Sequence, residues 1–184
     1  MMPGFSRFSF VKFPVLAALA ATLCGCSDSL RTFSCPGSAI LADAAIRPVL
    51  KPGAAATDPA ALLYTVRAVT IDTSCSLDRR AGEAASNVDL TFRATRAPSG
   101  QAAHYVVPYF LAINQGARVI NKRMFNVVID FAPGASAVTV QTAVSRSVLV
   151  LENGHLPTDY QYLAGLQLSD AEMAYLNSMG PYTP

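Results

Sequence analysis

The sequence predicts a mainly β protein: an antiparallel β-sandwich of the immunoglobulin-like type, with about 7–8 strands and one short C-terminal helix. After residue 62 the hydrophobic residues recur with a period of two, as in Val88, Leu90, Phe92 and Ala94. Turn residues interrupt this pattern about every 8–15 residues. Strands do not alternate with helices, which argues against a parallel sheet.

The segments at 40–41 and 49–50 are either one short strand each or a strand and a turn. Longer strands are then expected, in order, at 63–75, 88–95, 105–113, 117–131, 137–144, 147–152 and 160–168. The alternation slips between Ala68 and Val69, which predicts a bulge in the first long strand. Pro108 has no amide hydrogen to donate, so its strand should lie at a sheet edge or be bulged there. Phe125, Val127, Ile129 and Phe131 form one inward-facing set.

A short helix is expected immediately after the last strand. Ser169 and Glu172 have the spacing of a capping box, and Gly180-Pro181 should end the helix. Two turns of helix are not stable alone in water, so the helix should pack on the sheet. Met173 and either Tyr175 or Leu176 can face the sheet.

The first 25 residues have the pattern of a signal peptide. Arg7 and Lys12 form a basic region, and the apolar run at 14–23 that follows is too short for a bilayer core of about 30 Å. The next segment, Leu23–Cys26, resembles the bacterial lipobox. In that family of signals the chain is cleaved before the last cysteine, which carries diacylglycerol on its sulfur and an acyl chain such as palmitate on its nitrogen. The resemblance implies lipidation of Cys26.

Three parts of the chain follow from this pattern: a signal peptide at 1–25, a lipidated N-terminus and tether at 26–35, and a single β-sandwich domain at 36–180. Residues 27–34, fully extended, reach at most about 28 Å. In lipoprotein sorting, Ser27 after the lipidated cysteine favours the outer membrane, facing the periplasm, whereas Asp28 leaves the inner membrane possible.

The charge of the chain excludes one class of partner. Lys and Arg number 14 against 12 Asp and Glu, but the excess lies in the signal peptide. The remainder is formally neutral, whereas a nucleic-acid-binding domain is expected to keep a basic excess. We therefore expect no nucleic-acid partner.

The chain contains 4 cysteines, and processing leaves an even pair. Cys24 leaves with the signal peptide and Cys26 takes the lipid. Cys35 and Cys75 remain in an oxidising compartment, which predicts a structural disulfide between them. A redox or metal pair is the alternative, but neither a CxxC spacing nor a neighbouring histidine supports it.

The exported part also resembles a group of uncharacterised alphaproteobacterial lipoproteins. The shared features are the lipobox, Cys35-Pro36, Cys75, Val107–Phe110, Lys122–Phe125, Gly165–Ser169 and Tyr175–Asn177. The resemblance spans most of residues 23–177, and none of these motifs is catalytic. It implies a location and a β fold, and no activity.

No catalytic residue, metal ligand or cofactor is predicted, because the sequence lacks GxSxG, HExxH, Walker A and EF-hand motifs. Glu152, His155 and Asp159 could offer three metal ligands, but their spacing is also typical of a solvated loop. His104, the other histidine, starts a strand.

Three further sets of residues have two interpretations each. Arg79-Arg80 could contact lipid phosphates or form a solvated hairpin turn. Lys122-Arg123 interrupts an apolar strand, as charges do that guard a sheet edge. Two pairs of aromatic side chains suit either a ligand-binding strip or the core. Tyr105 and Tyr109 share one strand face, and Tyr160 and Tyr162 share another.

Two function classes follow from these observations. The first is a non-enzymatic, lipid-anchored cell-envelope protein that serves as a structural or protein-interaction module and binds an envelope protein along an exposed strand edge. The alternative is an extracytoplasmic hydrolase or a glycan-binding module, whose residues would converge only in the folded protein. A deep pocket lined by a histidine and a carboxylate would favour the alternative.

Overall fold

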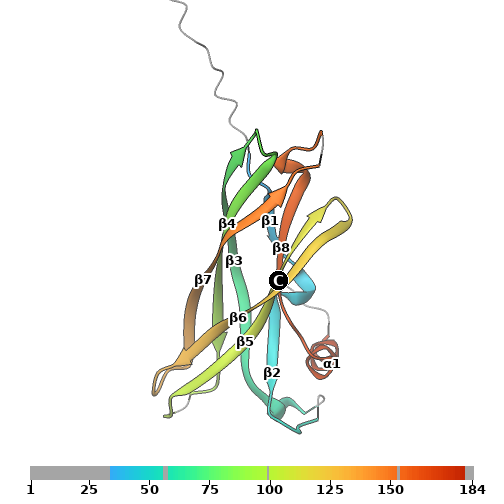
Figure 1. The fold of residues 1–184 in the computed structure, drawn as a ribbon. Coiled ribbons are helices and arrows are strands. Elements are labelled where there is room, and N and C mark those ends of the chain that lie inside the picture. The colour runs from blue at the N-terminus through green and yellow to red at the C-terminus, as the bar shows by residue number, and fades with distance from the viewer. Residues whose placement is uncertain (1–33, 56–57, 99, 153, 181–184) are drawn as a thin grey trace, which may run out of the picture. The chain divides into compact units, whose positions relative to one another are not determined.

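The computed structural model describes residues 34–55, 58–98, 100–152 and 154–180, all within one compact unit, Phe33–Pro184. These residues form two four-stranded sheets (Figure 1), ordered β1-β8-β5-β6 and β2-β3-β4-β7. The antiparallel β-sandwich with one C-terminal helix is confirmed. The single exception to antiparallel pairing among the described strands is β1, which runs parallel to β8.

The strands and the helix have the following bounds: β1 Gly37–Ile40, β2 Ile46–Leu50, β3 Leu62–Asp78, β4 Glu83–Thr95, β5 Ala103–Gln115, β6 Arg118–Phe131, β7 Ala137–Val150, β8 Tyr160–Leu166 and α1 Asp170–Ser178. Short 3-10 turns lie at η1 Ala42–Ala44, η2 Pro59–Ala61 and η3 Pro157–Asp159. The connectivity differs from that of an immunoglobulin constant domain, whose sheets are ordered ABED and CFG. Here three consecutive strands, β2, β3 and β4, lie side by side in one sheet, which neither immunoglobulin sheet has.

The core lies between the two sheets, and each strand contributes the alternate side chains that point inward. Val88, Leu90, Phe92 and Ala94 of β4 are each at most 1% exposed. The inward set of β6 is also confirmed, since Val127, Ile129 and Phe131 are buried and Phe125 is partly buried against them. Tyr109, Tyr160 and Tyr162 are buried in this core, which confirms the packing interpretation for them.

The strands at 137–144 and 147–152 are one continuous strand, β7, so the prediction of two strands was wrong. A bulge replaces the expected break, because Asn87 of β4 lies opposite two residues of β7. Arg146 has a φ of 52°, and its backbone N–H donates to Asn87 Oδ1 at 3.0 Å. This contact from the neighbouring strand holds the left-handed residue inside the ladder.

The bulge predicted in β3 is confirmed, since its register with β4 shifts between Ala68 and Thr70. Pro108 lies where β8 ends: the ladder between β5 and β8 starts at Tyr109 and Leu166. The Pro108 carbonyl accepts a hydrogen bond from Gln167 N at 3.0 Å. The proline nitrogen, which has no hydrogen to donate, points to the same side of β5, where β8 has already ended. The proline therefore lies where its strand has become an edge, as predicted.

Helix α1 has the predicted capping box: Glu172 N donates to Ser169 Oγ and Ser169 N donates to the Glu172 carboxylate. The same carboxylate accepts from Arg47 Nε of β2 at 2.9 Å in a buried ion pair. Tyr175 is the buried apolar side chain, whereas Met173 is 46% exposed and does not pack as expected. The ion pair and Tyr175 together hold the helix on the domain.

Gly165 of β8 is required by a close approach of two other elements. A Cβ atom at this position would lie 2.6 Å from Phe110 Cζ and 2.7 Å from Ala44 Cβ. Phe110 belongs to the neighbouring strand β5, and Ala44 to η1, which crosses from one sheet to the other. The missing side chain therefore lets η1 pass directly over the sheet.

We expect Gly165→Ala to destabilise the domain by about 1–3 kcal/mol, because the added methyl group overpacks a filled site. Gly37→Ala is the matched control in the neighbouring strand, since its Cβ would lie 3.9 Å from Gln161 Cγ, an ordinary contact. Urea unfolding of both variants measures the difference. Equal midpoints for the two variants would show that the site can relax.

Tyr64 of β3 is 4% exposed and stacks on Tyr105 of β5 with ring centroids 4.1 Å apart. Burial raises the pKa of Tyr64 from 10.0 to about 12, against the opposing charge of Arg47. The unfolded chain therefore loses the phenol proton at a lower pH than the folded chain. Stability that is fully present below pH 10 is lost as the pH rises toward 12.

For a difference of two pKa units the loss is about 3 kcal/mol. We expect the free energy of unfolding to fall between about pH 10 and pH 12 in the wild type, and to fall less in Tyr64→Phe, which has no proton to lose there. Urea unfolding across this range compares the two chains. The same slope in both would mean that Tyr64 ionises normally in the folded state.

Candidate interaction edges and the disulfide

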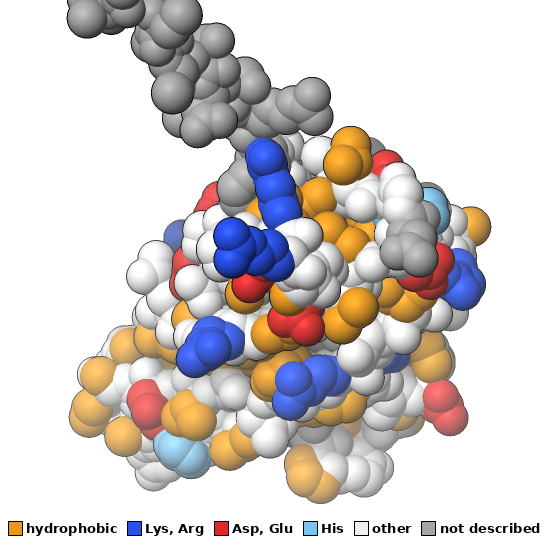
Figure 2. Space-filling view, turned by 45° about the horizontal axis from the view of Figure 1, so that its top comes forward, with side chains coloured by type: hydrophobic (Ala, Val, Ile, Leu, Met, Phe, Trp, Pro, Cys, Tyr) orange, Lys and Arg blue, Asp and Glu red, His pale blue; other side chains and the backbone are white. Residues whose placement is uncertain are grey.

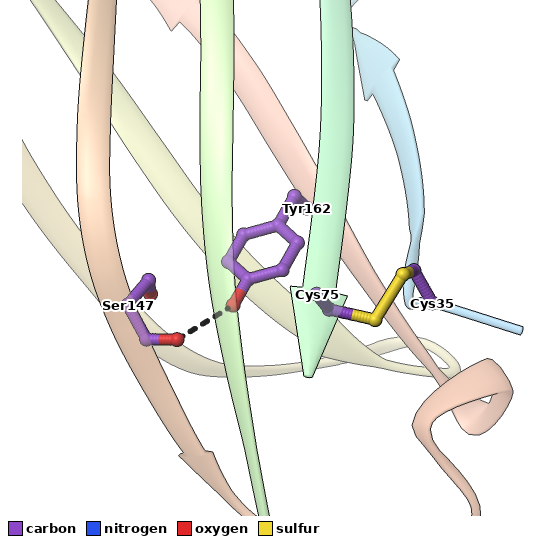
Figure 3. The surroundings of a disulfide bond; sticks show 4 residues. All are labelled: Cys35, Cys75, Ser147 and Tyr162. Atoms are coloured by element: carbon purple, nitrogen blue, oxygen red, sulfur yellow. Dashed lines mark hydrogen bonds between the residues drawn. A yellow bond between two sulfur atoms is a disulfide. The ribbon is translucent and has the colours of Figure 1, made fainter. Parts of the chain in front are cut away.

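Cys35 and Cys75 form the predicted disulfide, with Cα atoms 5.6 Å apart (Figure 3). Cys35 precedes β1 of one sheet and Cys75 lies in β3 of the other, so the bond connects the two sheets. Beside it, Tyr162 donates its hydroxyl hydrogen to the Ser147 carbonyl at 3.4 Å across the core. The expected lipidation site, Cys26, lies outside the described residues.

Strand registers place several features at the end of the sandwich that holds this bond, which we call the disulfide end. In one sheet Gly37 pairs with Gln161, and Gln115 pairs with both Tyr160 and Arg118. In the other sheet Glu83 pairs with Asp78 and with Val150. The β3–β4 turn, the β5–β6 turn and the loop between β7 and β8 therefore lie with Cys35 at this end, which is the top of Figure 1.

The edges at β1 and β2 offer little room for another strand. Strand β1 has 4 residues and β2 has 5. Strand β2 contains Pro48, and its Arg47 is bound to Glu172 of α1. Short edges, proline and a covering helix are the ways in which proteins prevent pairing with other chains.

The edge at β6 is long but charged. All side chains from Ala117 to Met124 are exposed, on both faces of the sheet. This segment contacts the sheet through its backbone pairing with β5. Lys122 Nζ lies 4.2 Å from the centre of the Phe110 ring, and the Arg123 guanidinium lies 5.6 Å from that of Phe125. The edge interpretation of Lys122-Arg123 is therefore confirmed, and these charges guard the strand against pairing.

The edge at β7 is long and unguarded. The strand has 14 residues and, among the described strands, pairs with β4 alone. Residues 137–144 read Ala-Val-Thr-Val-Gln-Thr-Ala-Val and contain no charge, proline or glycine. Its outward backbone groups are free for a further strand, and its β-branched side chains favour one.

The loop before β8 holds its charged groups in ordinary pairs. Arg118 Nη2 donates to Glu152 at 2.8 Å, and this hydrogen bond lowers the pKa of the Glu152 carboxyl. The Leu156 backbone N–H donates to Asp159 at 2.8 Å and lowers the pKa of that carboxyl, with a smaller contribution from His155. Within the described ranges, no three His, Cys, Asp or Glu side chains are grouped to hold a metal ion.

His104 pairs with Asp130 at 2.6 Å on the outside of the sheet, where their side chains are 65% and 70% exposed. Two hollows of about 690 and 460 Å³ lie elsewhere, one beside α1 and one on the outer face of β3, β4 and β7. Neither hollow includes His104 or His155. The structure does not bring a histidine and a carboxylate together in either hollow.

Comparisons with known proteins found no match, neither with a family model nor with a curated protein or a solved structure. Of the helices in the part of the chain that the structure describes, none is long and apolar enough to cross a membrane.

Two features of these edges were not predicted. The Arg47–Glu172 pair joins residues 125 positions apart, and no local pattern indicates such a contact. The uncharged character of residues 137–144 is visible in the sequence, but its meaning depends on β7 lying at an edge, which only the strand order shows. A scan for long strand segments without charge would have found the candidate.

Removing the disulfide should destabilise the domain by about 4 kcal/mol, because the bond closes a long loop and restricts the unfolded chain. The loop spans 40 positions. The double variant Cys35→Ala with Cys75→Ala, compared with the wild type in urea unfolding, measures the loss. Wild-type protein under reducing conditions is the control and should unfold at the midpoint of the variant. An unchanged midpoint would show that β1 and β8 hold the N-terminal segment without the bond.

Proposed function

We propose that this protein is a non-enzymatic, lipid-anchored module of the bacterial cell envelope that binds an extended segment of another envelope protein along β7. The proposal places it in the outer membrane, facing the periplasm, with acylated Cys26 as the anchor. The observation that carries the interaction is the edge at 137–144 of β7, which contains no charge, proline or glycine, whereas the outer strands β1 and β2 are short and β6 is charged.

Strand addition fits this edge chemically. A partner strand would form backbone hydrogen bonds with the unpaired N–H and C=O groups of β7. Its side chains would continue the two faces of the sheet. The inward-facing side chains of β7 lie at the margin of the core and include Val138, Val140 and Val144. The proposed partner segment therefore alternates apolar residues facing inward with polar residues facing outward.

A second copy of the chain fits the proposed anchor less well than a different protein. Two β7 strands that keep the inner faces of their sheets on the same side pair antiparallel about a two-fold axis. The two disulfide ends, and with them the two tethers, would then lie at opposite ends of the dimer. A segment from another protein has no such restriction.

The hydrolase or glycan-binding alternative receives less support. Such a site needs catalytic or binding groups in a cleft that excludes water. The His104–Asp130 pair lies in the open, and the His155–Asp159 pair is about two-fifths exposed, with side chains 41% and 45% exposed.

Metabolic labelling with a palmitate analogue tests the anchor. We expect the wild-type chain to be labelled and to fractionate with the outer membrane, and Cys26→Ala to remain unlabelled because it lacks the acceptor sulfur. Cys35→Ala is the matched cysteine control and should keep the label. Label of equal strength on Cys26→Ala would contradict the anchor.

Site-specific crosslinking in intact cells tests the edge. A photoreactive side chain at Ala143, which points outward on β7, should give one discrete adduct with another polypeptide. Gln141→Lys should abolish this adduct, because a lysine at the edge opposes strand addition. Thr91→Lys is the matched control: Thr91 of β4 shares the outer face with Gln141, but it pairs with Gln141 on one side and with Thr70 of β3 on the other, so it lies inside the sheet.

An adduct that survives Gln141→Lys, or that also forms from a photoreactive side chain at Thr70, would contradict docking along β7. An adduct the size of two copies of this chain would replace the proposed partner with a second copy.

A further inference from the structure

The disulfide end carries a pair of arginines that no contact within the domain uses. Arg79 and Arg80 lie in the β3–β4 turn, and both are exposed. The carboxylate of Asp78 accepts from the backbone N–H groups of Arg80 at 2.9 Å and of Ala81 at 3.0 Å, which fixes the turn. Across the described ranges neither guanidinium is in an ion pair.

Most acids of this end are already engaged. Asp78 holds the turn, Glu152 is paired with Arg118, and Asp159 accepts from the backbone of Leu156. Glu83 is half-buried at the base of the hairpin. These carboxylates keep their negative charge, but among the described ion pairs none joins them to Arg79 or Arg80, whose side chains are exposed in the turn.

Apolar side chains are exposed at the same end. Val150 of β7 is 65% exposed and lies beside the base of the hairpin, where it pairs with Glu83. Leu156 in the following loop is 64% exposed. Figure 2, which turns this end forward, shows blue Lys and Arg side chains with orange hydrophobic and some red acidic side chains between them. Basic and apolar side chains together suit the interface between lipid headgroups and acyl chains.

The chain outside the described residues ends at this surface. The tether of residues 27–34 reaches at most about 28 Å when fully extended, and Cys35 is fixed to Cys75, three residues before Asp78. A lipid on Cys26 would therefore keep the disulfide end close to the bilayer.

We propose that the disulfide end rests on the membrane, with Arg79 and Arg80 bound to the phosphates of anionic lipid headgroups and Leu156 and Val150 at the interface. This inference depends on the lipid anchor of the proposed function. It orients the strands away from the bilayer and leaves the β7 edge open along its length. Each arginine near an anionic surface should strengthen the contact about fivefold, and salt should weaken it.

Depth-dependent quenching tests the orientation on the acylated protein, reconstituted in vesicles of phosphatidylglycerol and phosphatidylethanolamine that contain a headgroup-attached quencher. A fluorescent side chain at Ala81, in the β3–β4 turn, should be strongly quenched. The same side chain at Ala132, in the turn after β6 at the opposite end, should not be quenched. Equal quenching at both positions, or stronger quenching at Ala132, would overturn the orientation.

The charge contribution is tested by Arg79→Gln combined with Arg80→Gln, which should reduce quenching at Ala81. Arg93→Gln, on the outer face of β4, is the matched control and should leave it unchanged. High salt, or vesicles of phosphatidylcholine alone, should act like the double variant. Quenching that none of these changes reduces would overturn the phosphate contact.

Flotation of the vesicles separates this inference from the anchor. Protein that floats with the vesicles but shows no difference between Ala81 and Ala132 retains the anchor and loses the orientation. Protein that does not float has no anchor, and both proposals then fail.

Discussion

The bond between Cys35 and Cys75 determines how the N-terminal part of the chain meets the domain. Strand β1 has only four residues and lies at a sheet edge, so its hydrogen bonds alone would hold the segment weakly. The disulfide adds a covalent link to β3 in the opposite sheet. It restricts the unfolded chain, connects the two layers, and fixes where a lipid-bearing tether would leave the domain. The proposed orientation on the membrane depends on this one link.

The four sheet edges differ in ways that a sandwich built only for stability would not need. Strand β2 is closed by a buried ion pair with α1, and β6 carries basic side chains along its exposed half. A buried pair such as Arg47–Glu172 adds little net stability over apolar packing, but it specifies where the helix docks. In strand β7 the bulge at Arg146 interrupts the edge, whereas residues 137–144 carry no charge or proline. An exposed edge without a partner is an aggregation hazard, which is why the proposed function gives this segment a partner strand.

The sequence predicted the features that depend on neighbours in the chain. Local patterns in the sequence indicate the strand at Val88–Ala94, the bulge at Ala68 and the capping box at Ser169. The number of cysteines left after processing indicates the disulfide. Features set by distant residues were not predictable: Asn87 stabilises the left-handed Arg146 and so joins two expected strands into one. The space over Gly165 depends on Phe110 and Ala44 from two other elements. Met173 was misplaced because helical periodicity leaves open which of several apolar residues faces the sheet.

The parallel pairing of β1 with β8 has a consequence for biogenesis. Gly37 and Gln161 are neighbours in the sheet but lie near opposite termini of the domain, so β1 has no strand partner until nearly the whole domain has been synthesised. Contacts between such distant segments form late and slowly. The cysteine partner, Cys75, comes much earlier in the chain. In an exported chain, as the proposed function requires, oxidation could therefore retain the N-terminal segment before the later strands have crossed the membrane. Acylation and oxidation would then precede the closing of the sheet, and a nascent chain would be tethered at the bilayer before it is fully folded.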